Sequence, residues 1–300
     1  MKPAEFEEKS YEGPLYNQLE RGNPTIFTPG QVLENTLGFD RGLFLAHDAL
    51  WETLGYKSPL KGAALAYYNW PEEYRPLQRR LQLPRFRLNL FLQAKRPVYH
   101  ERKPRSLRSI NGFSAPLWSF RITPHQQQLL ETLAEAMNGR AHVAYAAAAF
   151  HTYSALFTHT KRRTVVQNST FPSAKTLSGH TAWYYQVPGA LGAVNPDPER
   201  IEEPPLLDRL LRIARESEPY EAGDFGWLDL TARSVIAAVS ESERDDDGVT
   251  AHFFDDLQTL ERIAERYSLE SALHSYAQLN LFTERFDLAW LVVADGGKIL

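Results

Sequence analysis

The sequence contains no cysteine, which excludes disulfide bonds and thiolate metal sites. A chain without cysteine is typical of a reducing compartment, so we expect a cytoplasmic protein. The longest apolar stretches, residues 143–150 and 288–294, are much shorter than the roughly 20 residues of a membrane-spanning helix. The first ten residues also lack the apolar run of a signal peptide. We therefore expect no association with a membrane.

The formal net charge is only −4, which by itself argues weakly against nucleic-acid binding. The charges are nevertheless unevenly distributed. Residues 75–108 contain eleven Lys and Arg against one acid, Glu101, whereas residues 199–300 contain ten Lys and Arg against twenty-two Asp and Glu. A local basic stretch is what phosphate binding requires, although a solvated basic loop would give the same pattern.

Composition and hydropathy pattern divide the chain into three parts. Residues 1–27 are polar, contain Pro14 and Pro24, and are interpreted as an N-terminal extension. Residues 28–195 predict an α/β domain with a mixed sheet flanked by helices, and residues 196–300 predict a mainly helical, acidic region. The predicted helices are 29–37, 125–137, 205–216, 228–239, 252–267 and 269–279, and the predicted strands are 39–45, 85–94, 117–122, 142–148 and 286–294.

Two short motifs carry residues suited to phosphodiester hydrolysis. Asp40 stands at the head of a predicted strand, and Glu34 lies on the helix before it. Gln93 and Lys95 are two apart on the strand 85–94 and its continuation, so their side chains face the same side. Carboxylate and carbonyl oxygens are the ligands that Mg²⁺ prefers, and Glu34, Asp40 and the peptide carbonyl of Ala94 could supply them. Gln93 could bind the metal or its water, and Lys95 could hold the attacking water and the phosphate.

Gly38-Phe39-Asp40 followed by Leu92-Gln93-Ala94-Lys95-Arg96 resembles the D-(x)n-Q-x-K variant of the PD-(D/E)XK nucleases, as in Mrr-type restriction endonucleases and related prokaryotic defence nucleases. The resemblance covers roughly residues 28–150. It implies a restriction-endonuclease-like fold, a site built on Glu34, Asp40, Gln93 and Lys95, and cleavage of DNA that depends on Mg²⁺ or Mn²⁺. It also implies an anti-phage role. The interval between Asp40 and Gln93 is long for a hairpin, so an insertion must separate the two core strands.

The basic stretch straddles this motif, and we expect Arg85, Arg87 and Arg96 to contact DNA phosphates. The rival hypothesis is a non-catalytic nucleic-acid-binding or scaffold protein that keeps the nuclease fold. A third, purely structural interpretation of the motif is that Asp40 caps a turn and Lys95 is a surface strand lysine.

Other candidate sites have simpler explanations. The nine histidines show no zinc-binding spacing, and His125 is expected to pack at its helix start. Trp183-Tyr184-Tyr185 could stack on bases, but a core strand is the preferred interpretation. The acidic run 245–247 is expected to be a solvated loop rather than a calcium site.

The acidic C-terminal region makes a poor DNA surface because its charge has the same sign as the phosphates. Its helices have apolar faces, for example at Leu206, Leu210, Leu211 and Ile213. These faces could pack on the nuclease domain or contact another protein. We predict that the region mediates self-association, as in a homodimer, or binds a defence-system partner.

Overall fold

A five-stranded mixed sheet forms the centre of the protein. The computed structural model describes residues 1–22, 26–27, 86–186, 191–196, 198–216, 226–242, 248–267 and 271–294. The sheet has the order β2 (Ile26–Phe27), β11 (Ala289–Ala294), β3 (Phe86–Lys95), β6 (Ala141–Ala148) and β7 (Ser169–Thr170). Strands β3 and β6 are parallel, and the other neighbouring pairs are antiparallel. The mixed α/β class predicted from the sequence is therefore confirmed.

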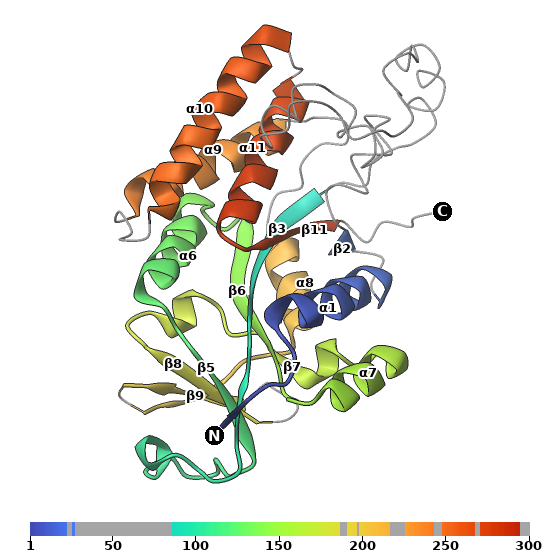
Figure 1. The fold of residues 1–300 in the computed structure, drawn as a ribbon, viewed down its shortest axis with the longest axis vertical. Coiled ribbons are helices and arrows are strands. Elements are labelled where there is room, and N and C mark those ends of the chain that lie inside the picture. Colours follow the sequence, from blue (N-terminus) through green and yellow to red (C-terminus); the bar gives the residue numbers. More distant parts are fainter. Residues whose placement is uncertain are drawn as a thin grey trace.

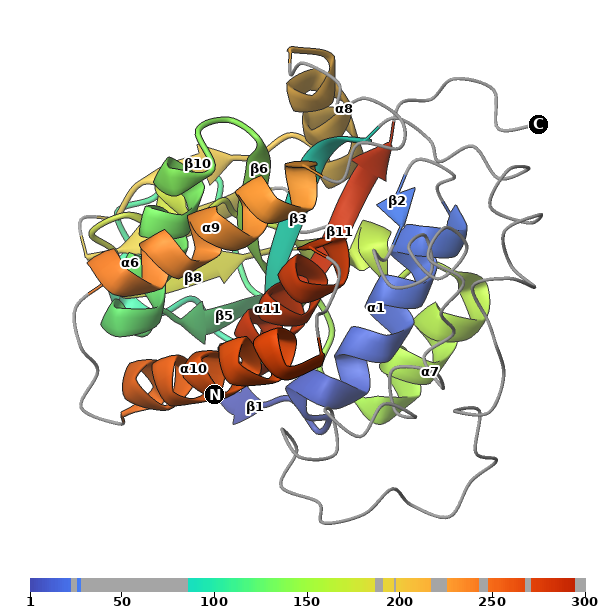
Figure 2. The same ribbon diagram turned by 90° about the horizontal axis from the view of Figure 1, so that it is seen from above.

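Helices cover both faces of this sheet, because the strand residues alternate between two cores. Leu88, Leu90 and Leu92 of β3 pack with α1 (Glu8–Gly22), α7 (Tyr153–Arg162) and α8 (Leu206–Glu216). Phe91 of β3 belongs to the opposite core, with α6 (Pro124–Ala136), α9 (Gly226–Glu241), α10 (Val249–Tyr267) and α11 (Ser271–Arg285). Figure 2 shows α6 and α9 on one side of β3 and β11, with α1 and α7 on the other. This two-sided burial confirms the alternation predicted for residues 85–94.

A buried amide ties the central strand to its neighbours. Asn89 of β3 is 1% exposed, and its Oδ1 accepts a hydrogen bond from Trp290 Nε1 at 3.0 Å. Its Nδ2 donates to the Arg140 carbonyl at 3.2 Å and to Thr231 Oγ1 at 3.3 Å. Both polar ends of this side chain are thus satisfied, as a buried amide requires.

A second, antiparallel sheet lies at the lower end of the molecule in Figure 1. Its order is β1 (Lys2–Pro3), β4 (Val98–His100), β5 (Leu117–Arg121), β8 (Ala182–Tyr185), β9 (Leu191–Asn195) and β10 (Arg200–Glu202). Trp183 and Tyr185 of β8 are fully buried, which confirms that the aromatic strand is part of the core. Gly192 on β9 makes this possible, because a Cβ there would lie 1.9 Å from the Trp183 ring.

The C-terminal region is mainly helical, as predicted, but it does not stand apart from the sheet. Strand β11 lies between β2 and β3, and α9 and α11 share the core of α6. Leu206 and Leu210, whose apolar face was considered for protein contacts, are buried against β3. Residue 195 is therefore not the boundary of an independent core. Among the helices that the structure describes, none has the length and hydrophobicity needed to cross a bilayer.

The N-terminal residues also differ from their prediction as an extension. They form β1 and the 15-residue helix α1. Tyr11, Leu15 and Leu19 repeat at i, i+4 and i+8 and are buried against the central sheet. Pro14 inside the helix obscured this stripe, and burial of the apolar face outweighs the cost of the proline. The predicted helix 29–37, strand 39–45 and acidic run 245–247 lie outside the described residues.

Candidate functional site

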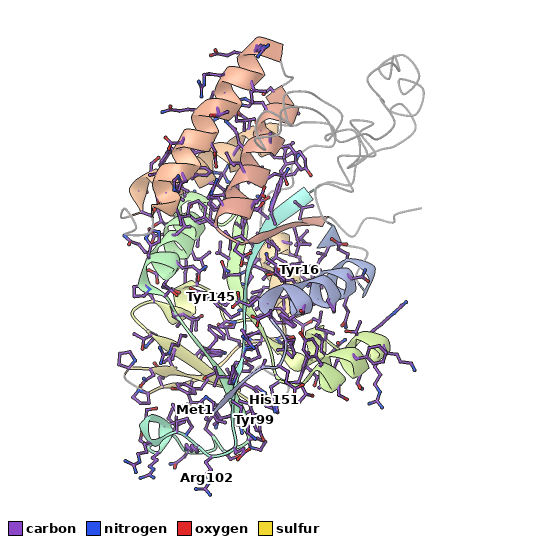
Figure 3. All side chains as sticks on the ribbon, viewed as in Figure 1. Met1, Tyr16, Tyr99, Arg102, Tyr145 and His151 are labelled. Carbon is purple, nitrogen blue, oxygen red and sulfur yellow. The ribbon has the colours of Figure 1, made fainter. Side chains whose placement is uncertain are left out.

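The candidate site lies at the C-terminal end of β3, where Gln93, Ala94 and Lys95 follow one another. Their neighbours on the parallel strand β6 are Tyr145, Ala146 and Ala147 respectively. Gln93 and Lys95 occupy alternate positions of one strand, so both belong to the face that carries Tyr145 and helix α6. Figure 3 places Tyr145 in the middle of the molecule. The other two predicted site residues, Glu34 and Asp40, lie outside the described residues, as does Arg85.

Lys95 is a partly buried cation held between an aromatic ring and an amide. Its Nζ donates to Gln126 Oε1 in the first turn of α6 and lies 5.8 Å from the centroid of the Tyr145 ring. Burial lowers the pKa of the Lys95 ammonium, because the charged form loses solvation. This side chain is therefore partly buried, unlike the surface strand lysine of the purely structural interpretation.

Tyr145 is itself fixed in place. The strand buries it completely, and its hydroxyl donates to Gln127 Oε1 at 2.9 Å. Burial raises the pKa of this hydroxyl, so it stays protonated and neutral near pH 7. Gln127 in turn donates to the Ala174 carbonyl at 2.7 Å. The first turn of α6 thus orients both the ring below Lys95 and the amide that contacts it.

Gln93 has an oxygen that is buried without a hydrogen-bond donor among the described residues. The residue is 1% exposed, and its Nε2 makes one long contact, 3.5 Å, with the Ala94 carbonyl. Its Oε1 has no hydrogen-bond partner in the part of the chain that the structure describes. Buried polar atoms are nearly always hydrogen-bonded, and exceptions concentrate where a ligand, ion or water completes the set.

Two carboxylates outside the predicted motif act on Lys95. The negative charges of Glu8 and Asp287 partly offset the effect of burial on the lysine pKa. Glu8 Oε1 accepts a hydrogen bond from the Arg96 backbone at 2.9 Å, and Asp287 pairs with Lys9. Neither residue has a local signal in the sequence, because Glu8 belongs to the supposed extension and Asp287 precedes the last described strand. Only the pairing of β3 with β11 and the packing of α1 bring them to this end of β3.

The basic residues predicted to bind DNA differ in their location and hydrogen-bond partners. Arg96 fastens the N-terminal segment: its Nε and Nη2 donate to the Ala4 carbonyl at 3.0 and 2.5 Å, and its Nη1 pairs with Glu7 Oε1 at 2.8 Å. Its hydrogen-bonding groups are thus already occupied within the chain. Arg87 belongs to β3. The contact of either residue with phosphate stays a prediction.

The donor chemistry of the site suits a hard cation. Gln93 Oε1, which has no partner within the described residues, and the adjacent backbone carbonyl are oxygen ligands of the kind that Mg²⁺ and Mn²⁺ bind, and the chain has no cysteine to supply a thiolate. Within the described ranges, no group of three or more His, Asp or Glu side chains could hold a metal by itself. The carboxylates expected to complete the set are Glu34 and Asp40.

No protein-family model matches this sequence, and neither a curated protein nor a solved structure matches it. Function must therefore be inferred from the residues and their geometry.

Proposed function

We propose that this protein is a deoxyribonuclease of the PD-(D/E)XK kind, dependent on Mg²⁺ or Mn²⁺ and serving in prokaryotic anti-phage defence. The observation that carries the proposal is the Gln93–Lys95 pair. One strand end presents a buried carbonyl oxygen that has no donor among the described residues. It lies beside a partly desolvated ammonium, on one face of a mixed sheet flanked by helices. Neither feature contributes to the stability of a core, since both an unmet oxygen and a desolvated cation are costly.

The residues divide into two roles in this proposal. Glu34, Asp40, Gln93 Oε1 and the Ala94 carbonyl would hold the metal, which would neutralise charge that develops on the phosphate. Lys95 donates hydrogen bonds to the attacking water and to a phosphate oxygen. A partly buried ammonium interacts more strongly with an anion than a solvated one does, because less water screens it. Gln126 holds the lysine in position until an anion replaces it as acceptor.

The direct test is cleavage of supercoiled plasmid DNA with Mg²⁺ or Mn²⁺. Lys95→Ala should lower the cleavage rate by about 100-fold or more, the usual effect of removing a group that assists proton transfer. Lys175→Ala is the matched control, because Lys175 is an exposed lysine of the short helix Lys175–Leu177, outside the proposed site. Cleavage by Lys95→Ala at the rate of the control, or undiminished cleavage in excess EDTA, would contradict the proposal.

A second candidate function is nucleic-acid binding without cleavage. It is favoured by the contact of Lys95 with Gln126, which already occupies the ammonium. A purified wild-type chain that binds plasmid but leaves it intact with both metals would support this candidate over the nuclease.

A further inference from the structure

Helix α7 exposes two aromatic rings on the surface. The helix is anchored by Leu156, which is 7% exposed and lies in the core beneath the central sheet. Thr152 caps its start, where Thr152 Oγ1 accepts a hydrogen bond from the Ala155 backbone at 3.1 Å. On the solvent side, Tyr153 is 53% exposed and Phe157 is 72% exposed. These residues are four apart and therefore neighbours on one helix face.

Three consecutive cations close the same helix. Lys161, Arg162 and Arg163 are all exposed. No Asp or Glu occurs between Ala136 and Pro196, so the sequence around α7 offers these cations no acidic partner. At the opposite end of the helix, Glu5 Oε2 accepts a hydrogen bond from the Tyr153 backbone at 2.9 Å. The helix thus carries exposed aromatic side chains in its first half and a cluster of positive charges at its C-terminal end.

Arg163 occupies a backbone position that normally favours glycine. Its φ of 55° and ψ of 47° are left-handed, and its carbonyl accepts a hydrogen bond from Gln18 Nε2 at 2.5 Å. Cations near a helix C-terminus interact favourably with the helix dipole, which accounts for Lys161 and Arg162. The dipole does not account for a long side chain at a strained position, where glycine would adopt the same backbone without strain. It does not account for the exposed Phe157 ring either.

We propose that the exposed surface of α7, with Tyr153, Phe157 and Lys161 along one face and Arg162 and Arg163 at its C-terminal end, is a docking surface for single-stranded nucleic acid. Unpaired bases stack on exposed aromatic rings, and phosphates bind the adjacent cations. A double helix hides its base faces, so it cannot use the rings in this way. A bilayer is a poorer fit, because two rings one turn apart offer little apolar area, and Leu156 faces the protein core.

The location of α7 relates this surface to the nuclease site. The helix follows directly after β6, whose Ala147 is paired with Lys95. The helix therefore begins at the edge of the sheet where the candidate site lies. The choice of ligand rests on the proposed function. Because α7 covers the sheet face opposite to Gln93 and Lys95, an unpaired segment of the DNA substrate held there would reach the cleavage site around the C-terminal end of β3.

Binding of a fluorescently labelled oligo(dT) to the full chain in EDTA tests the surface without cleavage. Phe157→Ala should weaken binding by about 5- to 100-fold, the range for loss of one stacked base, while Phe157→Trp should retain it. Lys161→Glu and Arg162→Glu should weaken binding and reduce its dependence on salt. The control is Arg262→Glu, a change of an exposed arginine on α10. Helix α10 lies far from α7 in both views (Figures 1 and 2).

Arg163→Gly separates binding from folding. Glycine relieves the left-handed backbone, so the melting temperature should be equal or higher, whereas oligo(dT) binding should fall. Unchanged oligo(dT) binding by Phe157→Ala, Lys161→Glu and Arg162→Glu would overturn the proposal. So would equally tight duplex binding that Phe157→Ala does not weaken, or α7-dependent binding of phosphatidylserine vesicles without binding of oligo(dT). Plasmid cleavage distinguishes the two proposals. If the wild-type protein does not cleave plasmid but its oligo(dT) binding depends on α7, only the nuclease proposal is refuted. If the wild-type protein cleaves plasmid and the α7 variants bind oligo(dT) and cleave plasmid as well as it does, only the docking surface is refuted.

Discussion

The ammonium of Lys95 lies 5.8 Å from the centre of the Tyr145 ring, which belongs to the neighbouring parallel strand. The face of an aromatic ring attracts a cation but does not share a proton with it. The ring therefore supports the lysine without neutralising it, and Gln126 supplies a neutral acceptor. This arrangement keeps a charged group partly desolvated and available to an incoming anion.

The first prediction concerns stability and pH. The folded protein binds its Lys95 proton less tightly than the unfolded chain does, because burial lowers the lysine pKa from 10.5. Stability contributed by this residue therefore rises with pH between the lowered pKa and 10.5, and the penalty is fully present below that window. Lys95→Met removes the penalty, so it should be more stable than the wild type at pH 7, with a smaller difference at pH 9.5. Urea denaturation at both pH values measures this, and a variant that is less stable at pH 7 would contradict it.

A second prediction concerns the pH dependence of cleavage. If Lys95 acts as an ammonium, activity should fall as pH rises through its lowered pKa. The negative charge of Glu8 raises this pKa, so Glu8→Gln should move the alkaline limb of the rate profile to lower pH. The amide can still accept the hydrogen bond from the Arg96 backbone. Glu135→Gln, an exposed change on α6, is the control, and an identical shift in both variants would argue against a local effect.

The local patterns in the sequence predicted those elements whose side chains have a regular period. The strand 85–94 and the helices after residue 205 were found in this way. Pairing between distant segments has no such signature. No sequence pattern near Ala289 indicates that its strand lies beside Leu92. The change in charge used to place a boundary at residue 195 reflects amino-acid composition, which does not show how the chain folds.

The candidate site, like the fold, was predictable only where it depends on local sequence patterns. The two-residue spacing of Gln93 and Lys95 placed both on one face of a strand, but their surroundings come from remote segments. Gln126, Tyr145 and the carboxylates of Glu8 and Asp287 meet there only after the sheet and α1 have assembled. Sequence spacing can therefore nominate a catalytic pair, whereas the groups that adjust its pKa depend on tertiary structure.

A third prediction uses two glycines with opposite surroundings. Gly192→Ala should destabilise the protein by about 1–3 kcal/mol, because the new Cβ would overlap the buried Trp183 ring. Gly13→Ala should be neutral or stabilising by up to about 1 kcal/mol, because Gly13 is exposed on α1 and its Cβ would meet nothing within 4 Å. Thermal unfolding of both variants measures the difference. Equal melting temperatures would show that β8 and β9 do not pack as described.

The last prediction compares two buried amides on the same face of β3. Asn89 has partners for both its oxygen and its nitrogen, whereas Gln93 Oε1 has none in the described part of the chain. Replacing a hydrogen-bonded buried amide leaves its partners without hydrogen bonds. Asn89→Leu should therefore lower the free energy of unfolding by about 1–3 kcal/mol, because Trp290 Nε1 loses its acceptor. Gln93→Met removes an unmet oxygen and keeps a similar shape, so it should stabilise the protein by about 1 kcal/mol.

If Gln93 helps to hold the metal, the same Gln93→Met change should lower the rate of plasmid cleavage by about 100-fold while the folded protein becomes more stable. Such an exchange of stability for activity is typical of functional positions. Urea denaturation and plasmid cleavage, measured on one preparation of each variant, give both quantities. A Gln93→Met protein that is less stable than the wild type would mean that Oε1 has a structural partner, such as a buried water. A stable Gln93→Met protein that cleaves at the wild-type rate would remove Gln93 from the metal site.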